Sequence, residues 1–317
     1  MFWRSVARST KRKSLRTSSA LTGLSSDTRR LQKKKGRGRD MAKEMQGALA
    51  AKHALVYGTL KKNWPLMPVV DGVELTNICN LSCPNCPTPT TQYPRGYATE
   101  QTVTLAMRYA APDSLFSFHR LGEPFLHKSF LHYLRLAGET GLRAVVSTNG
   151  TLLNTARMEE MLDARPWSVM VSLHTRKSLE AFARLAEHCF AHNVFPPKFC
   201  ANLLSHNRDD VFAWADDMQL DSRIRDLFRD VQSHSWAGNV AARKTVYDDA
   251  HMQEMVRRCF FIRFNHVNIR WDGSVVACCL DSENITQLGH VHDLPKIRQN
   301  PAGYALCRTC DRDWMHD

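Results

Sequence analysis

Short hydrophobic runs alternate with amphipathic stretches between residues 70 and 232. Strands buried in a parallel sheet form near-continuous apolar runs, and four runs fit this description: Leu115–Phe118, Ala144–Ser147, Val169–Leu173 and Phe199–Leu204. Between them, apolar residues recur at the spacing of a helix face: Phe130, Leu131, Leu134 and Ala137 in one stretch, and Leu179, Phe182, Leu185 and Ala186 in another. Repeated strand–helix units predict an α/β fold built on a parallel sheet, open or closed.

The pattern changes after residue 233. A polar, irregular stretch leads to Cys259, and two short alternating runs, Val267–Trp271 and Val275–Ala277, then follow with Asp272 and Gly273 between them. An Asp-Gly pair between two alternating runs predicts a β-hairpin. We therefore expect a barrel-like domain at residues 70–232 and a second, smaller domain at residues 233–317.

The net charge of +12 belongs to the N-terminal part of the chain. Residues 1–45 hold 14 of the 43 Lys and Arg and 3 of the 31 Asp and Glu, which leaves 29 against 28 in the rest. Because such a segment cannot offset its own ordering entropy, we expect a disordered tail at 1–45 and a lead-in segment at 46–69. Binding of this tail to nucleic acid or an anionic surface, or a transit role, are alternatives. Nucleic acid is not the partner that we expect.

No stretch of the chain approaches the roughly 20 apolar residues that span a bilayer, and the N-terminus lacks the apolar region of a secretory signal. We therefore expect a cytoplasmic protein with no membrane partner. Ten cysteines in a reducing compartment favour metal binding or catalysis over disulfides. Cys189 and Cys200 stand alone in a helical and a strand-like stretch, where cysteine behaves as a small hydrophobe, and they are assigned no role.

Three cysteines lie within eight residues, directly after the strand-like segment Val73–Ile78. The spacing of Cys79, Cys83 and Cys86 is C-x3-C-x2-C. Three thiolates on one short loop can hold three irons of a cubane cluster and leave the fourth open, so that a small molecule can bind the metal directly. Cysteine spacing of this kind also occurs at zinc sites and among structural thiols.

Polar motifs follow the next three predicted strands. Gly122, Glu123 and Pro124 come after the first of these, Ser147 and Asn149 end the second, and Ser172 and His174 end the third. In a parallel α/β array the carboxyl ends of strands face the ligand. A Glu there can accept hydrogen bonds from an ammonium group, and hydroxyl and amide groups can bind a ribose. A lone His such as His174 is often simply packed.

The C-terminal part holds five further cysteines: Cys259, Cys278, Cys279, Cys307 and Cys310. Four of them can complete a closed cubane site, and the pair Cys307 and Cys310 brings two ligands onto one tight turn, as zinc and iron–sulfur sites both allow. Structural zinc is the alternative.

These motifs, in this order, resemble those of radical S-adenosylmethionine (SAM) enzymes. One departure is Asn85, since many members of the family carry an aromatic residue before the last cysteine. The resemblance implies a partial (β/α)6 barrel of the TIM type, a [4Fe–4S] cluster on Cys79, Cys83 and Cys86, and a SAM site. That site would hold the cofactor with Gly122, Glu123, Pro124, Ser147, Asn149 and Ser172.

The C-terminal part resembles the auxiliary-cluster modules called SPASM and twitch, in which a Gly precedes a cysteine ligand as Gly273 precedes Cys278. The resemblance implies a second [4Fe–4S] cluster. By the Gly spacing we assign it to Cys259, Cys278, Cys307 and Cys310. This count leaves Cys279 outside the ligand set, although Cys278 and Cys279 could exchange roles.

The resemblance also implies the reaction. The first cluster reduces SAM to methionine and a 5′-deoxyadenosyl radical, which abstracts hydrogen from an unactivated C–H bond. Hydrogen return from a thiol would make an epimerase, electron loss would make a dehydrogenase, and capture by a substrate thiol would crosslink a peptide. We choose the epimerase because it alone explains Cys279, which would then be the catalytic hydrogen donor.

The chain is similar to radical SAM epimerases of aminoglycoside antibiotics, of the neomycin type, over roughly residues 70–317. We therefore expect an aminoglycoside-like small molecule as the substrate, with Asp281 and Glu283 as candidate carboxylates for a polyamino sugar, and a flavodoxin or ferredoxin as the electron donor. Peptide maturase and aminocyclitol dehydrogenase are the alternatives. A non-enzyme alternative is an iron–sulfur or zinc regulator that binds nucleic acid, but it gives no reason for Gly122–Pro124 or Ser147–Gly150.

Overall fold

The computed structural model describes residues 68–231, 234–240 and 245–311. The expected basic tail at 1–45 and nearly all of the lead-in segment lie outside these residues. In the described part of the chain, nine strands form one sheet. They are β1 (Val69–Val73), β2 (Leu115–Ser117), β3 (Arg143–Thr148), β4 (Ser168–Ser172), β5 (Lys198–Leu204), β6 (Phe228–Val231), β7 (His266–Ile269), β8 (Ser274–Val276) and β9 (Gln287–His290).

The sheet has the strand order β6-β5-β4-β3-β2-β1-β7-β8-β9. Strands β1 to β6 pair in parallel with their neighbours, as the four predicted apolar runs require. This arrangement is the α/β fold that the sequence predicts, a partial barrel of parallel strands. Because all six strands run the same way, their carboxyl ends lie at one edge of the sheet, where loops can build a site.

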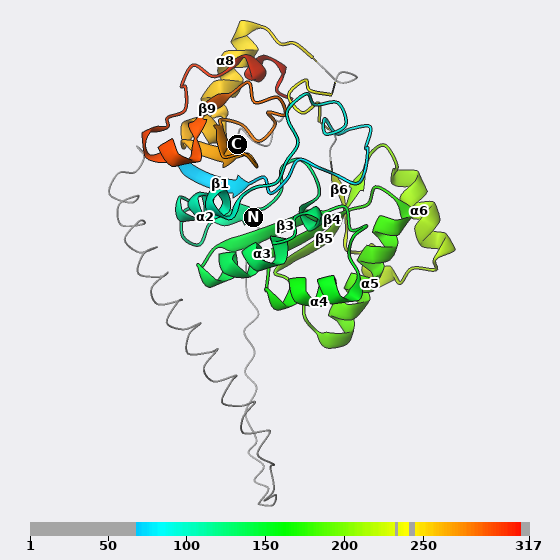
Figure 1. The fold of residues 1–317 in the computed structure, drawn as a ribbon. Helices are drawn as coiled ribbons and strands as arrows, with labels where there is room; N and C mark the ends of the chain where they lie inside the picture. The colour runs from blue at the N-terminus through cyan, green and yellow to red at the C-terminus, as the bar shows by residue number, and fades with distance from the viewer. Residues whose placement is uncertain (1–67, 232–233, 241–244, 312–317) are drawn as a thin grey trace, which may run out of the picture. The chain divides into compact units, whose positions relative to one another are not determined.

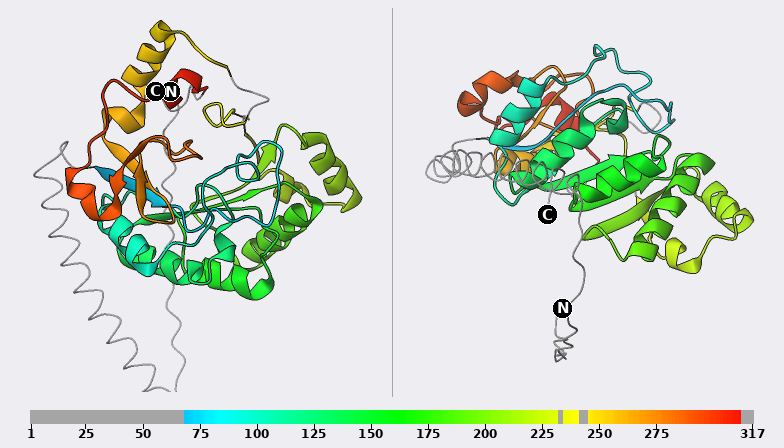
Figure 2. Two further views of the ribbon diagram at one scale, coloured as in Figure 1. Left: turned by 45° about the horizontal axis from the view of Figure 1, so that its top comes forward. Right: turned by 60° about the horizontal axis from the view of Figure 1, so that its bottom comes forward.

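Helices follow most of the parallel strands. They are α2 (Glu100–Arg108), α3 (Phe130–Glu139), α4 (Thr155–Asp163), α5 (Arg176–His192), α6 (Arg208–Asp217), α7 (Ser222–Arg225), α8 (Asp249–Arg258) and α9 (Phe260–Arg263), with short 3₁₀ turns η1 (Pro124–Leu126), η3 (Val291–Lys296) and η4 (Ala305–Thr309). Figures 1 and 2 show α3, α4 and α5 along one face of the strands, with the cyan loop after β1 on the other side. None of the described helices is long and apolar enough to cross a membrane.

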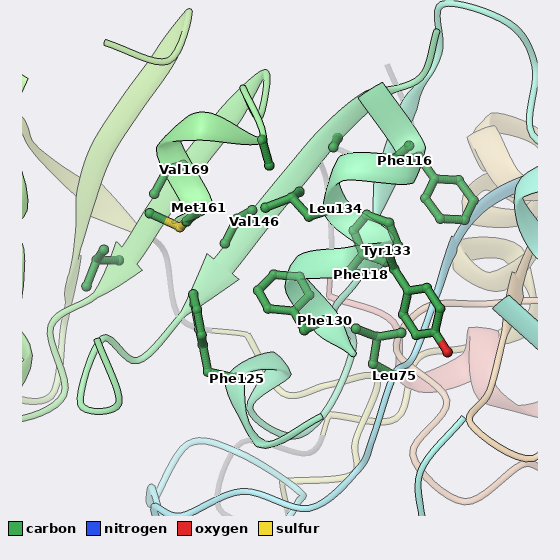
Figure 3. Close-up of a cluster of buried hydrophobic side chains, with 14 of the residues drawn as sticks. Leu75, Phe116, Phe118, Phe125, Phe130, Tyr133, Leu134, Val146, Met161 and Val169 are labelled. Carbon is green, nitrogen blue, oxygen red and sulfur yellow. The ribbon is translucent and has the colours of Figure 1, made fainter. Parts of the chain in front are cut away.

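The core lies between the sheet and these helices. Figure 3 shows aromatic side chains from β2, α3 and η1 meeting there. The Phe118 and Phe130 rings lie 6.0 Å apart and the Phe125 and Phe130 rings 4.9 Å apart, both edge to face. This geometry aligns the positive edge of one ring with the negative face of the next. Phe130, at the start of α3, therefore fixes the helix against the strand end that carries Gly122 and Glu123.

Strand β1 is shifted from the expected position. The sequence suggests a strand over Val73–Ile78, but β1 ends at Val73 and the following residues leave the sheet. Their polar side chains bond the segment around residues 94–96 instead: Thr76 Oγ1 donates to Gly96 O at 2.7 Å, and Asn77 Nδ2 donates to Pro94 O at 2.8 Å. This departure carries the chain toward the cysteine loop.

The predicted hairpin is confirmed as β7 and β8, joined through Asp272 and Gly273. The sheet continues from the barrel into this hairpin, because β7 pairs with β1 in parallel. Strand β9, which the sequence analysis missed, adds a further antiparallel strand. Cys278 and Cys279, which come shortly after β8, thus follow an extension of the barrel sheet. The domain boundaries stay a prediction.

The core packing generates a stability prediction. Phe130→Ala should lower the free energy of unfolding by about 3–5 kcal/mol, since a large buried ring leaves a cavity; Phe130 is 1% exposed. Ile285→Ala is the control, because Ile285 is 61% exposed and should cost less than about 0.5 kcal/mol. Denaturant midpoints would compare the two variants, and equal losses would contradict the assignment of the core.

Candidate functional site

A cavity of about 320 Å³ opens at the carboxyl ends of the parallel strands. Most of the residues predicted from sequence to bind cluster and cofactor line it together: Cys79, Cys83, Cys86, Gly122, Glu123, Ser147, Asn149 and Ser172. Pro124 is not among the lining residues; it begins η1 and so shapes the turn after Glu123. Residues from four separate predicted motifs therefore meet in one place.

Burial and neighbouring thiols raise the pKa of Cys79 and of Cys83 in the cysteine loop. Burial raises the pKa of Cys83 to about 12, and the charges of Cys86 and Cys79 act in the same direction. Burial also raises the pKa of Cys79, with Glu123 and Cys86 adding to the effect. Three thiolates are therefore costly here unless a cation neutralises them, which iron does.

The donor set fits a cubane cluster. Among the described residues, no three His, Cys, Asp or Glu side chains lie close enough to hold a single metal ion. Three thiols on one loop match a cluster with one open iron, because a cubane spreads its ligands over several iron atoms.

Glu123 joins two of the predicted motifs. Its carboxylate is 1% exposed and accepts hydrogen bonds from Asn149 N at 2.8 Å, Thr148 Oγ1 at 2.7 Å and Phe125 N at 3.1 Å. Burial raises its pKa, and these three bonds oppose the shift. A carboxylate offers about four acceptor positions, so Glu123 has room for one further donor from a ligand.

Gly122 is required by its surroundings. Its φ is +76°, and a Cβ there would lie 2.3 Å from Thr76 O and 2.7 Å from Ile78 O. The next residue, Glu123, donates its N–H to Ile78 O at 2.9 Å. The backbone before the cysteine loop and the Gly-Glu turn are therefore in direct contact, which places Glu123 beside the three thiols.

Asn149 has more partners than the sequence suggested. Its Nδ2 donates to Asn80 Oδ1 at 3.0 Å, and its Oδ1 accepts from Thr151 N at 2.9 Å. Asn80 lies inside the cysteine loop, so Asn149 ties the end of β3 to that loop. Ser147 and Ser172 line the cavity without such a tie.

Histidines surround the remaining wall of the cavity. His174, which the sequence analysis considered, lines it with Nδ1 3.2 Å from Cys83 Sγ. His119, His206 and His234 were missed, as were Arg120 and Trp236. The available signal was positional: His119, His174 and His206 each stand two residues beyond the end of a parallel strand.

Two of these histidines are uncharged at neutral pH. Burial lowers the pKa of His119 to about 4, and its Nδ1 lies 2.9 Å from Ser117 Oγ. Burial, aided by His206, lowers the pKa of His174 to about 4. Asn85, the departure from the family pattern, pairs with His206 at 2.9 Å between Nδ2 and Nδ1.

A second, smaller pocket of about 30 Å³ lies in the C-terminal part. The four cysteines assigned to the second cluster line it: Cys259, Cys278, Cys307 and Cys310. Mostly apolar side chains, Met255 and Leu306 among them, form the rest of its wall, with Thr286 and Tyr304. Four thiols in an apolar setting fit a closed cubane site.

Cys279 lines neither pocket. Its thiol nonetheless acts on two of the four. A hydrogen bond with Cys279, together with burial, raises the pKa of Cys278, and burial, with a smaller contribution from the charge of Cys279, raises the pKa of Cys259. The carbonyl of Cys279 accepts a hydrogen bond from Arg120 Nε at 3.1 Å, and Arg120 belongs to the wall of the first cavity.

The carboxylates expected to meet a polyamino sugar do not line the cavity. Asp281 is completely buried, and its carboxylate accepts from Thr286 N and Thr286 Oγ1, both at 2.7 Å. Glu283 accepts from Gln92 N at 3.1 Å. Asp281 thus organises the turn after Cys279, and Glu283 bonds the segment that contains Gln92. These contacts contradict the expected contact of both carboxylates with substrate.

Comparisons with known proteins agree with this geometry. The Radical SAM superfamily model matches residues 73–190, and the model of SPASM, an iron–sulfur cluster-binding domain, matches residues 259–311. A search of curated proteins found no match.

Several solved structures are similar. BtrN in complex with AdoMet and 2-DOIA is 14% identical, with 79% of this chain and 96% of BtrN covered and a TM-score of 0.54. The anSMEcpe protein with bound AdoMet is 14% identical, with 72% and 76% covered and a TM-score of 0.49. SuiB of Streptococcus suis, bound to S-adenosylmethionine, is 14% identical, with 80% and 75% covered and a TM-score of 0.48.

The two matched domains imply SAM and [4Fe–4S] clusters as cofactors, the SPASM domain binding auxiliary clusters. The three-cysteine cavity and the four-cysteine pocket lie within or beside the matched segments and have the donors for one cluster each. The chain therefore carries a radical SAM domain at residues 73–190 and, after it, an SPASM domain at residues 259–311.

Proposed function

We propose that this radical SAM enzyme inverts one carbon of a small hydroxyl-rich molecule, and that Cys279 supplies the returning hydrogen. One observation carries the proposal. Four cysteines line the second pocket and Cys279 does not, while the Cys279 backbone is bonded to Arg120 in the wall of the first cavity. A thiol outside the ligand set, on a residue whose backbone is bonded to the wall of the first cavity, suits hydrogen-atom donation.

The residues would act as follows. When bound at the first cluster, SAM is cleaved by one electron and supplies the group that takes a hydrogen atom from the substrate. Cys79, Cys83 and Cys86 would hold this cluster. Glu123 would accept a hydrogen bond from the SAM ammonium group at its fourth acceptor position. Ser147, Asn149 and Ser172, at two neighbouring strand ends, would bind the ribose.

Inversion follows from donation on the opposite face of the carbon. The S–H bond of Cys279 breaks, a new C–H bond forms, and the sulfur is left one electron and one proton short of a thiol. A reductant, for which we propose a flavodoxin or ferredoxin, supplies the electron, and water supplies the proton. The product then has the mass of the substrate and carries one hydrogen from solvent.

The charge of the cavity wall bears on the substrate. Among the described residues that line the cavity, Glu123 is the one carboxylate, and three of its acceptor positions are taken. Besides the Arg120 guanidinium, the wall offers neutral donors and acceptors, including His119 and Asn202. An aminoglycoside stays within the proposed class, but this wall favours a reacting ring that presents hydroxyl rather than ammonium groups.

The first prediction concerns SAM binding. Glu123→Gln keeps the shape and an acceptor oxygen but removes the charge, so the bond to an ammonium group should weaken by about 1.5–3 kcal/mol, or roughly 10- to 100-fold in affinity. Calorimetric titration of the cluster-loaded protein with SAM measures the loss. Because the carboxylate is the binding form and burial raises its pKa, wild-type affinity should fall as the pH falls through that raised value.

Glu160→Gln is the control for this titration. Glu160 is exposed and pairs with Arg135 at 3.2 Å, far from the cavity lining. The Glu160→Gln variant should bind SAM with the affinity of the wild type. Equal affinity in Glu123→Gln would remove Glu123 from the cofactor site.

The second prediction concerns Cys279. The cluster-loaded enzyme is incubated in deuterated water with a panel of neomycin-type aminoglycosides and neutral cyclitols such as myo-inositol. The compound that stimulates formation of 5′-deoxyadenosine is taken as the substrate. Cys279→Ser should keep that stimulation but yield no inverted product and no solvent deuterium in the product. Cys189→Ala, in a buried position on α5, serves as the matched cysteine control and should retain both.

Product mass separates the alternatives. A wild-type product in which one deuterium has replaced one carbon-bound hydrogen supports the epimerase. A product two hydrogens lighter than its substrate would make the enzyme a dehydrogenase, and inverted, labelled product from Cys279→Ser would exclude this thiol as the donor.

A further inference from the structure

Arg120 connects the wall of the first cavity with the turn that carries Cys278 and Cys279. It stands three residues after β2 and lines the cavity. Its Nε donates to Cys279 O at 3.1 Å, and its Nη2 donates to Cys278 O at 3.4 Å and to Asp281 O. One guanidinium thus contacts three carbonyls of a single tight turn.

We propose that Arg120 is a positioning residue that decides which of the two adjacent cysteines binds the auxiliary cluster. By holding the carbonyls of Cys278 and Cys279 at one guanidinium, it turns the Cys278 thiol into the second pocket and keeps the Cys279 thiol outside it. The inference rests on the ligand assignment used in the proposed function, and it gives that assignment a physical cause.

The two thiols need such a selector because they are nearly equivalent. Cys278 and Cys279 are neighbours in sequence, their side chains are hydrogen bonded to each other, and Cys279 is also close to Cys259. Successive side chains of an extended segment point to opposite sides, so a change in the backbone torsions of the turn can alter which thiol faces the pocket. Arg120 bonds the carbonyls of both cysteines and thereby restrains the backbone torsions of this turn.

Arg suits this task better than Lys. Its guanidinium is planar and presents several N–H donors in a fixed fork, whereas an ammonium group is a point charge on a flexible stem. Two different nitrogens of Arg120 reach two successive carbonyls. An ammonium group has three donors but no fixed fork, so it would restrain two successive carbonyls less well.

The fork itself is held in place by burial and charge. Arg120 is 9% exposed, and its Nη1 lies 3.7 Å from Glu74 Oε2. Glu74 is completely buried and also faces Arg270, with 3.8 Å between Arg270 Nε and Glu74 Oε1. Moving the Arg120 guanidinium would leave a buried carboxylate short of one cation, which is costly.

Arg270 provides a matched comparison inside the same network. It is completely buried and shares Glu74 with Arg120. Its donors reach Asp281 O at 3.3 Å and Ser282 O at 3.2 Å. These carbonyls follow the two cysteines, so Arg270 supports the same turn at a point beyond the peptide that Arg120 holds.

The test is alkylation of the anaerobically reconstituted full-length protein with iodoacetamide, read by peptide mass spectrometry. A thiolate bound to iron is shielded, so wild-type protein should be alkylated roughly tenfold more at Cys279 than at Cys278. In Arg120→Met the ratio should fall toward one. Arg120→Lys should be intermediate, and Arg270→Met should keep the wild-type ratio.

A second measurement uses the reduction potential of the auxiliary cluster, followed by electron paramagnetic resonance. Loss of a buried cation next to a cluster ligand disfavours the reduced, more negative cluster. Arg120→Met should therefore shift the potential to more negative values, and Arg120→Lys should restore part of the shift. The first cluster should still assemble and give a signal, because its three cysteines are unchanged.

Circular dichroism and the signal of the first cluster show which variants are folded. If Arg120→Met does not fold, Arg120→Lys decides. A folded Arg120 variant with the wild-type alkylation ratio and potential overturns the inference and leaves the proposed function intact. Preferential alkylation of Cys278 in the wild type overturns both the inference and the role of Cys279. If the alkylation ratios are as expected but Cys279→Ser still forms the inverted product, the proposed function is wrong and the inference about Arg120 stands.

Discussion

The Glu74 carboxylate lies buried between two guanidinium groups, at 3.7 Å from Arg120 and 3.8 Å from Arg270. Removing one member of such a buried network leaves an uncompensated charge and costs about 3–5 kcal/mol, so its three positions are tightly constrained. Glu74 follows β1 and precedes the cysteine loop, Arg120 follows β2 and precedes Gly122, and Arg270 follows β7. The network therefore joins the beginnings of the three segments that build the two cysteine sites.

Local contacts then transmit this constraint to the chemistry. Leu121 N donates to Glu74 Oε2 at 3.4 Å, and Glu123 N donates to Ile78 O at 2.9 Å. The Gly-Glu turn is consequently attached to the backbone that leads into the three thiols. Arg120 also donates hydrogen bonds to the carbonyls of Cys278 and Cys279, and these bonds hold the turn around Cys278. The parallel pairing of β1 with β7 gives both attachments a common sheet.

The sequence predicts the parts of the site that rest on short motifs at strand ends. Cys79, Cys83 and Cys86, Glu123 and Asn149 all follow apolar runs, and the alternation of those runs places them at one edge of the sheet. His119 and His206 also follow strands. Because neither belongs to a recognisable short motif, the sequence does not distinguish them from histidines elsewhere in the chain. Asp281 was misjudged because its position two residues after Cys279 does not reveal that its partners come from Thr286.

The buried charges were hidden for a different reason. Glu74 and Arg270 are almost two hundred positions apart, and only the pairing of β1 with β7 brings them together. Periodicity finds amphipathic faces and strand alternation, yet a charge buried by a distant partner looks like a surface charge. Strand β9 was missed similarly, since its short, Gly-containing stretch has little β propensity of its own.

The central claim is that the three-cysteine cavity holds a cluster with an iron open to SAM. Electron paramagnetic resonance of the reduced, anaerobically reconstituted protein tests it most directly, with and without SAM. The account predicts about eight irons per chain, four for each cubane. It also predicts that adding SAM changes the resonance signal of the wild type and of Cys307→Ala, but not that of Cys83→Ala. Stoichiometric zinc at the three cysteines, or a wild-type signal that SAM leaves unchanged, would contradict it.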